Sequence, residues 1–137
     1  AGTLKMLSKR HIWAFVLCCY FATVLFLCLA KPQQVPGLEM TFWGIEADKI
    51  AHFLMFIPFP VLAYFAFVPV RCGKRRKFLC IIAIAIMAAV MALMTEKVQE
   101  LLGYRSFEIK DLIADLSGTV AGTVAILAYI ALKTEQK

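Results

Sequence analysis

Ionisable side chains recur at helical spacing beside several very apolar stretches of this 137-residue sequence. Three pairs lie four positions apart: Asp48 with His52, Glu96 with Glu100, and Asp111 with Asp115. Positions i and i+4 share one face of a helix, so each pair would point its side chains in the same direction. Histidine exchanges a proton near neutral pH, and a carboxylate orients it or accepts the proton. These pairs therefore suit acid–base chemistry or the binding of a polar ligand.

A polar site is predicted where these pairs meet. Its expected lining is Asp48, His52, Glu96, Gln99, Arg105, Asp111 and Asp115. The candidates for proton transfer are His52, Glu96, Asp111 and Asp115. Arg105 adds a planar fork that fits phosphate or carboxylate. A solvated rim of ordinary ion pairs is the simpler interpretation, and it suits Lys97 and Glu100. It suits His52 and Asp115 less well, because both lie inside apolar stretches, where an ionisable group is costly.

Motifs for a catalytic nucleophile or a bound metal are absent from the sequence. It contains neither G-x-S-x-G nor H-E-x-x-H. His52 with several carboxylates could hold zinc or another divalent cation. The spacing around His52 matches no standard zinc motif, however, so we expect neither a metal nor another cofactor. The five cysteines show neither zinc spacing nor a disulfide framework, and we expect them to pack as small apolar residues.

The elements that must position these residues are four apolar blocks, at residues 12–30, 50–70, 78–95 and 112–132. The chain is 62% hydrophobic and only 18% charged, which excludes a disordered chain and argues against a soluble domain of this size. About 20 apolar residues span a bilayer as a helix, which satisfies its own backbone groups. The sequence thus predicts an all-α integral membrane bundle of four transmembrane helices, forming one domain over residues 1–137.

The expected helices cover about residues 12–30, 50–70, 78–95 and 111–132. The apolar run of the first exceeds that of a typical signal peptide, so we expect it to be retained as a span. Pro58 and Pro60 should bend or split the second helix. Gly118 and Gly122 form a G-x-x-x-G pattern in line with Asp115, which predicts close helix contact on that face.

Loop charges predict the orientation of the bundle. The N-terminal flank, the loop at 71–77 and the C-terminal tail hold ten basic residues and one acidic residue. The other end of the bundle holds five basic and eight acidic residues. By the positive-inside rule both termini are cytoplasmic, an N-in/C-in topology. The basic loop lies between two spans without interleaved aromatic residues, so we expect it to meet membrane lipids and no nucleic acid.

The order of the polar residues resembles the VanZ-like family, small bacterial membrane proteins named after a teicoplanin-resistance protein. The matching pieces are Asp48-Lys49-x-x-His52-Phe53, Glu96-x-x-Gln99, and Arg105-Ser106-Phe107-x-x-x-Asp111-x-x-Ala114-Asp115-x-x-Gly118. The resemblance covers about residues 46–128. The family often has Asn in place of Asp115, and Pro-Gly in place of Gly103-Tyr104. The resemblance implies a multi-pass protein of the bacterial cytoplasmic (inner) membrane, linked to the envelope or to the glycopeptide response.

Two functions stay open for the predicted site. It could act on an envelope lipid, a cell-wall precursor or a glycopeptide or lipopeptide antibiotic, contributing to teicoplanin-type resistance. Alternatively, the same residues could bind a lipid-linked or lipopeptide ligand without turnover. A proton or ion pathway is disfavoured, because residues 12–30 and 78–95 carry no charge and no charged route reaches the cytoplasmic end.

Overall fold

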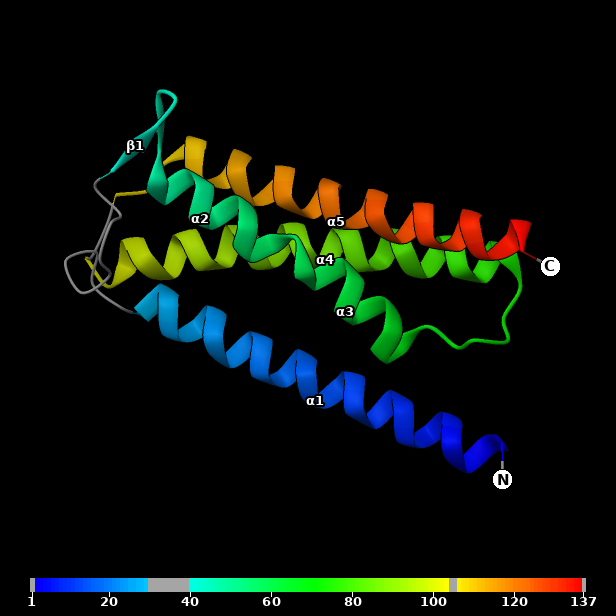
Figure 1. Ribbon diagram of the computed structural model, residues 1–137. Helices are drawn as coiled ribbons and strands as arrows, with labels where there is room; N and C mark the ends of the chain where they lie inside the picture. The colour runs from blue at the N-terminus through cyan, green and yellow to red at the C-terminus, as the bar shows by residue number, and fades with distance from the viewer. Residues whose placement is uncertain (1, 30–39, 104–105, 137) are drawn as a thin grey trace.

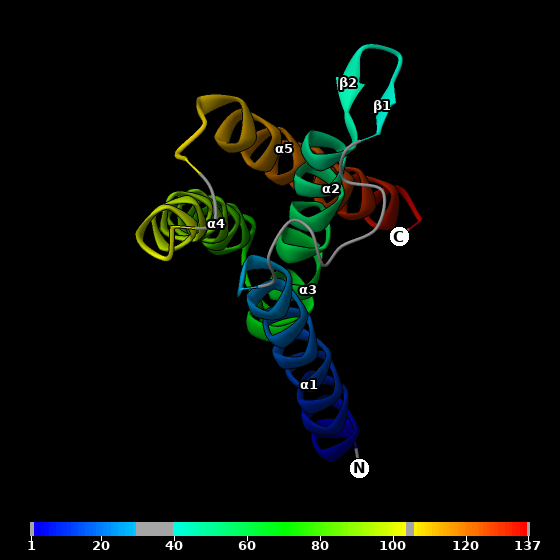
Figure 2. The same cartoon turned by 90° about the vertical axis from the view of Figure 1, so that its left-hand side faces the viewer.

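The computed structural model describes residues 2–29, 40–103 and 106–136, and it is mostly helical (Figure 1). In chain order the elements are α1 (Gly2–Leu29), β1 (Thr41–Phe42), β2 (Ile45–Glu46), α2 (Ala47–Phe56), α3 (Pro58–Phe67), α4 (Lys74–Leu101) and α5 (Ile109–Glu135). Figures 1 and 2 show the long helices running lengthwise beside one another, with α2 and α3 following each other between α1 and α5. The predicted all-α bundle is confirmed.

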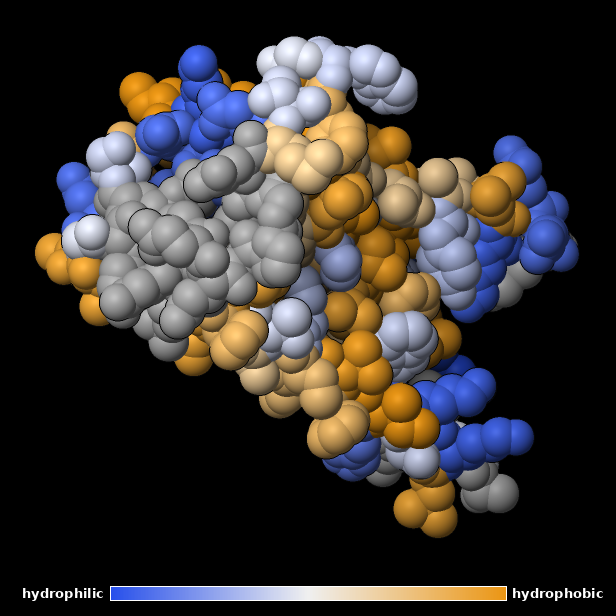
Figure 3. All heavy atoms as spheres, turned by 60° about the vertical axis from the view of Figure 1, so that its left-hand side comes forward, coloured by the Kyte–Doolittle hydropathy of each residue, from blue (hydrophilic) through white to orange (hydrophobic). Residues whose placement is uncertain are grey.

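Four segments of the described chain are long and apolar enough to span a membrane: Ser8–Leu27, Ala47–Phe67, Lys74–Leu101 and Ile109–Glu135. Large apolar side chains point outward on several helices, among them Phe26, Ile86 and Val120. Figure 3 shows apolar surface across the middle of the molecule and hydrophilic residues toward its ends. α4 and α5 extend beyond the predicted blocks, because charged residues continue a helix where it leaves the hydrocarbon.

The second span is broken at Ile57, as the prolines indicated. Pro58 opens α3, where its missing N–H costs little. Ile57 itself keeps right-handed helical dihedrals, with φ −60° and ψ −46°, so α2 and α3 form one bent span rather than two separate helices. Beside the break, the Tyr20 hydroxyl of α1 donates to the Met55 carbonyl at 2.5 Å. This bond ties α1 to the bend.

A short hairpin that the sequence did not predict leads into α2. Thr41 pairs with Glu46, and Phe42 with Ile45. The two residues between them, Trp43 and Gly44, both have positive φ, as a type I′ turn requires. The N–H of Ala47 then donates to the Met40 carbonyl at 2.8 Å. The hairpin thereby fixes the point at which α2 starts.

The buried apolar core fills the bundle alongside and beyond the bend. Its members include Phe59, Ala63, Ile84, Ala88 and Ile126. These side chains come from α3, α4 and α5, and α1 adds Leu17 and Val24 to the buried set. The turns at the start of α2, the end of α4 and the start of α5 bury polar side chains instead. The apolar core holds the helices at the separation that the buried polar side chains need.

Candidate functional site

Three helix ends bring the predicted polar residues together at one end of the bundle (Figure 1). α2 supplies Asp48 and His52, α4 supplies Glu96 and Gln99, and α5 supplies Asp111 and Asp115. All six are buried, and Asp115 has no exposed surface. Arg105, the seventh predicted residue, lies outside the described residues. The i,i+4 pairs on α2 and α5 thus point inward together.

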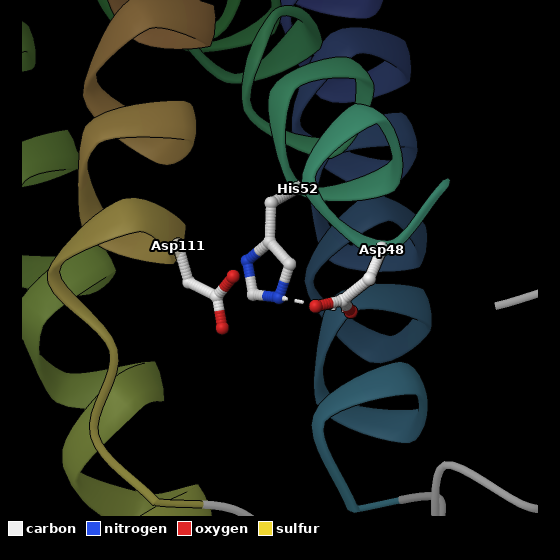
Figure 4. Close-up of side chains that lie close together, drawn as sticks. All are labelled: Asp48, His52 and Asp111. Atoms are coloured by element: carbon white, nitrogen blue, oxygen red, sulfur yellow. Dashed lines mark ion pairs between the residues drawn. The ribbon is translucent and has the colours of Figure 1, made fainter. Parts of the chain in front are cut away.

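His52 lies at the centre of the cluster, with its ring between α2 and α5 (Figure 4). Its Nδ1 is 2.8 Å from Asp115 Oδ1 and 3.6 Å from Glu96 Oε1. Its Nε2 is 3.9 Å from Asp48 Oδ1, one turn earlier on α2. One imidazole ring therefore meets a carboxylate from each of three helices.

Lys49 is part of the cluster although it was not in the predicted lining. Its Nζ is 2.6 Å from Asp111 Oδ1, 2.7 Å from Glu108 Oε2 and 3.2 Å from Asp48 Oδ2. Glu46 adds a fourth carboxylate at 3.3 Å. The signal in the sequence was its place beside Asp48 in the motif Asp48-Lys49-x-x-His52. A single ammonium group therefore joins the rim carboxylates to the buried ones.

Two exposed residues at this end behave as the simpler interpretation predicted. Lys97 Nζ and Glu100 Oε2 are 3.0 Å apart, three positions apart on α4, and both side chains are about half exposed. Such surface pairs contribute about 0–1 kcal/mol to stability. Lys97 also lies 5.0 Å from the ring centroid of Phe107. These residues form a solvated rim, in contrast to the buried His52 cluster.

Close packing of α5 on the bent span sets the register of Asp115. A Cβ atom on Gly118 would overlap the backbone carbonyl of Phe53, the residue after His52. A Cβ on Gly122 would overlap the carbonyl of Ile57 in the same way. Only glycine allows this approach, as in other small-residue contacts between membrane helices. The glycine pair thus brings Asp115, one turn before Gly118, within hydrogen-bond reach of His52.

Two buried acceptor atoms of the cluster have no hydrogen-bond partner among the residues that the structure describes. They are Gln99 Oε1 and Asp115 Oδ2. A buried polar atom left without a partner costs about 1–3 kcal/mol, so such atoms call for an explanation. Both are acceptors, and a ligand that meets them must bring hydrogen-bond donors or positive charge.

Within the described chain, two groups of three residues have the spacing to hold a metal ion. One is His52, Glu96 and Asp115, and the other is Asp48, His52 and Asp111. In each group the possible ligand atoms lie within 4.8 Å of one another. Imidazole nitrogen with carboxylate oxygen is a donor set that zinc accepts. No linear sequence motif predicts either group, because the possible ligands come from different helices.

The hydrogen bond between His52 and Asp115 fixes what the imidazole can do. An ionised carboxylate only accepts, so Nδ1–H of His52 is then the donor to Asp115. A neutral ring in that tautomer leaves Nε2 as a proton acceptor on the side of Asp48. The arrangement has the parts of an acid–base centre, a ring oriented by one carboxylate with a second near its other nitrogen.

Comparison with known families gives one match that covers nearly the whole chain. The family model described as VanZ/LLP1 matches residues 6–132. That range contains α2, α4 and the bend between α2 and α3, and it covers α5 as far as Leu132. Searches among curated proteins and among solved structures found no match.

Proposed function

This chain belongs to the VanZ/LLP1 family, and we propose that it is a bacterial inner-membrane protein whose buried polar site binds the head of an envelope ligand. The ligand class is an envelope lipid, a lipid-linked cell-wall precursor or a glycopeptide or lipopeptide antibiotic. The strongest support is the burial of six polar side chains between α2, α4 and α5. Ionisable groups inside a membrane bundle are costly and are characteristic of functional sites.

Two buried acceptors without a partner in the described ranges narrow the chemistry of the ligand. Gln99 Oε1 and Asp115 Oδ2 both need donors. Sugar hydroxyls and peptide N–H groups are donors, and lipid-linked cell-wall precursors and glycopeptides carry both. Four carboxylates already surround the Lys49 ammonium. A ligand phosphate would therefore bind the guanidinium group of Arg105, which the sequence predicts to line the site, rather than Lys49. We therefore favour a donor-rich head over a bare phosphate.

The proposed orientation places this site at the outer face of the membrane. Ten basic residues on the terminal flanks and the loop at 71–77 would be cytoplasmic by the positive-inside rule. The site at the opposite end would then meet precursors and antibiotics on the outside. Protection against teicoplanin-type antibiotics would follow from capture or alteration of such a ligand.

Antibiotic susceptibility of producing cells tests the proposal. Asp115→Ala removes the carboxylate that orients the imidazole, and His52→Ala removes the central ring. Both variants should lose protection against teicoplanin while membrane abundance, measured by immunoblot, stays unchanged. Lys97→Ala removes an exposed cation at the same end and should keep protection. Equal protection by all three variants, or a loss that merely follows abundance, would contradict the proposal.

Turnover is the second candidate, favoured by the Asp115-oriented ring of His52. Purified protein incubated with a lipid-linked precursor should then yield a product visible by mass spectrometry, and the His52→Ala variant should yield none. Stoichiometric binding without product would reject turnover and leave the binding function intact.

A further inference from the structure

A groove at the other end of the bundle has no part in the polar site. It has a volume of about 1010 Å³, at the upper end of the roughly 300–1,000 Å³ of small-molecule pockets. It is lined by the start of α1, the end of α3, the start of α4 and the end of α5. The 22 positions on α4 from Lys74 to Glu96 correspond to about 33 Å of helix, so the two sites lie far apart.

The shape of the bundle leaves this groove open. Figures 1 and 2 show α1 diverging from α4 and α5 toward the N-terminus, with both chain ends at this end of the molecule. α1 packs mainly on α3, which is shorter than its neighbours. Trp13 of α1 stacks on Phe65 of α3, with ring centroids 4.8 Å apart, and both line the groove. The floor is apolar, with Ile81 and Ile130 from the two other helices.

Basic side chains surround this apolar floor. They are Lys9, Arg10, Lys74, Lys77 and Lys133, and the acidic residue among the lining is Glu135. The cations come from three helices, so no single charged stretch of sequence accounts for them. An apolar trough with a cationic rim complements an amphipathic anion, which has an acidic head and a hydrocarbon tail.

The start of α4 strengthens the preference for an anion. Its first turn carries basic residues and no acidic one, and Gly73 provides no side-chain cap. Cations at a helix N-terminus oppose the macrodipole, and an anion there would be stabilised by both the dipole and the lysines. Lys74 and Lys77 line the groove, whereas their neighbours Arg75 and Arg76 do not.

We propose that this groove is a binding site for an anionic phospholipid. The phosphate lies among Lys9, Lys74 and Lys77, and an acyl chain lies along Trp13 and Ile81 in the trough. Arg10 lines the groove too, but its guanidinium already donates to the Ala66 and Phe67 carbonyls at the end of α3. The site is independent of the function proposed for the His52 cluster.

Adjacent charges in the first turn of α4 provide a matched test. The double variant Lys74→Ala/Lys77→Ala removes two groove cations, and Arg75→Ala/Arg76→Ala removes two cations outside the groove. Both are made in a Trp43→Phe background, so that Trp13 is the fluorophore. Full-length protein in nanodiscs of phosphatidylcholine is then titrated with phosphatidylglycerol brominated on its acyl chains, and quenching of Trp13 is measured.

Phosphatidylglycerol should quench Trp13 well above its mole fraction, whereas brominated phosphatidylcholine should not. The groove variant should raise the phosphatidylglycerol content needed for half-maximal quenching by about fivefold for each lysine removed. The control variant should raise it by less than about twofold. Equal weakening by both variants would mean a diffuse charge effect and would overturn the site. Inorganic phosphate has no acyl chain, so it should not affect the quenching of Trp13 as phosphatidylglycerol does. An equal effect of the two would also overturn the site. Circular dichroism of both variants separates misfolding from lost binding.

Discussion

Replacing Gly118 by alanine should push α5 away from α2 and disturb the polar site. The added Cβ would overlap the carbonyl oxygen of Phe53 and lie 3.1 Å from the Phe56 Cβ. The first of these is a backbone atom within a helix, which cannot swing aside as a side chain can. The helices must therefore separate. Because Asp115 is one turn before Gly118, its 2.8 Å bond to His52 would lengthen.

The magnitude follows from three opposing effects. Alanine in place of glycine stabilises a helix by about 1 kcal/mol. Overpacking a close contact costs about 1–3 kcal/mol. A buried hydrogen bond to a charged group contributes about 1.5–3 kcal/mol, and weakening it loses part of that contribution. The free energy of unfolding of the Gly118→Ala variant should therefore fall by about 2 kcal/mol.

Equilibrium unfolding in mixed detergent micelles, followed by circular dichroism, measures this change. Val120→Ile is the matched control, because it also adds one carbon to α5 but on an exposed face. It should change the free energy of unfolding by less than about 0.5 kcal/mol. Gly122→Ala repeats the test at the Ile57 carbonyl. If both glycine variants were as stable as the parent or more so, glycine contact would not set the spacing of α2 and α5.

Three further predictions concern other links in the structure. Asp115→Ala leaves the buried Nδ1 of His52 without its acceptor, so unfolding in the same assay should become easier by about 1–3 kcal/mol. A double-mutant cycle with His52→Ala should show a coupling of about 0.5–3 kcal/mol, and strict additivity would contradict a direct bond. Trp43 is fully exposed on the hairpin, and in a Trp13→Phe background its fluorescence should be quenched more by lipids brominated near the headgroup than near the chain end. Deeper quenching would place the hairpin elsewhere. Finally, a membrane-impermeant maleimide should label Cys72 of the basic loop only in inside-out vesicles, and labelling of intact cells would reverse the proposed orientation.

Much of the fold could be predicted because lipid allows few solutions. Four long apolar blocks lead to four helical spans, and Pro58 in the second leads to its break. The hairpin could not be predicted in the same way. Its strands have two residues each, and its turn is Trp43-Gly44 rather than a common hairpin pair such as Asn-Gly. Nothing in the local pattern distinguishes it from a loop.

The sequence predicted that polar side chains of α2, α4 and α5 would lie together, but it did not predict which of them would be in contact. Helical periodicity shows that Asp111 and Asp115 share a face, and the glycines indicate which face is packed. Periodicity does not show which helix is opposite, so the pairing of Asp115 with His52 appears only in the fold. Lys49 was missed for the same reason, since its partner Glu108 lies 59 positions away in sequence.

Energetics also argue that the His52 cluster is there for function. Replacing buried charged groups by packed apolar residues of similar volume is often neutral or stabilising, so a bundle selected for stability alone would not need them. Here α5 combines Asp115 with Gly118 on one face, giving up glycine's helix propensity to bring a costly carboxylate against an imidazole. Within the described part of the chain, two acceptors in that cluster, on Gln99 and Asp115, have no partner. Such a combination is hard to explain as packing, and it makes sense if a donor-rich ligand completes the site.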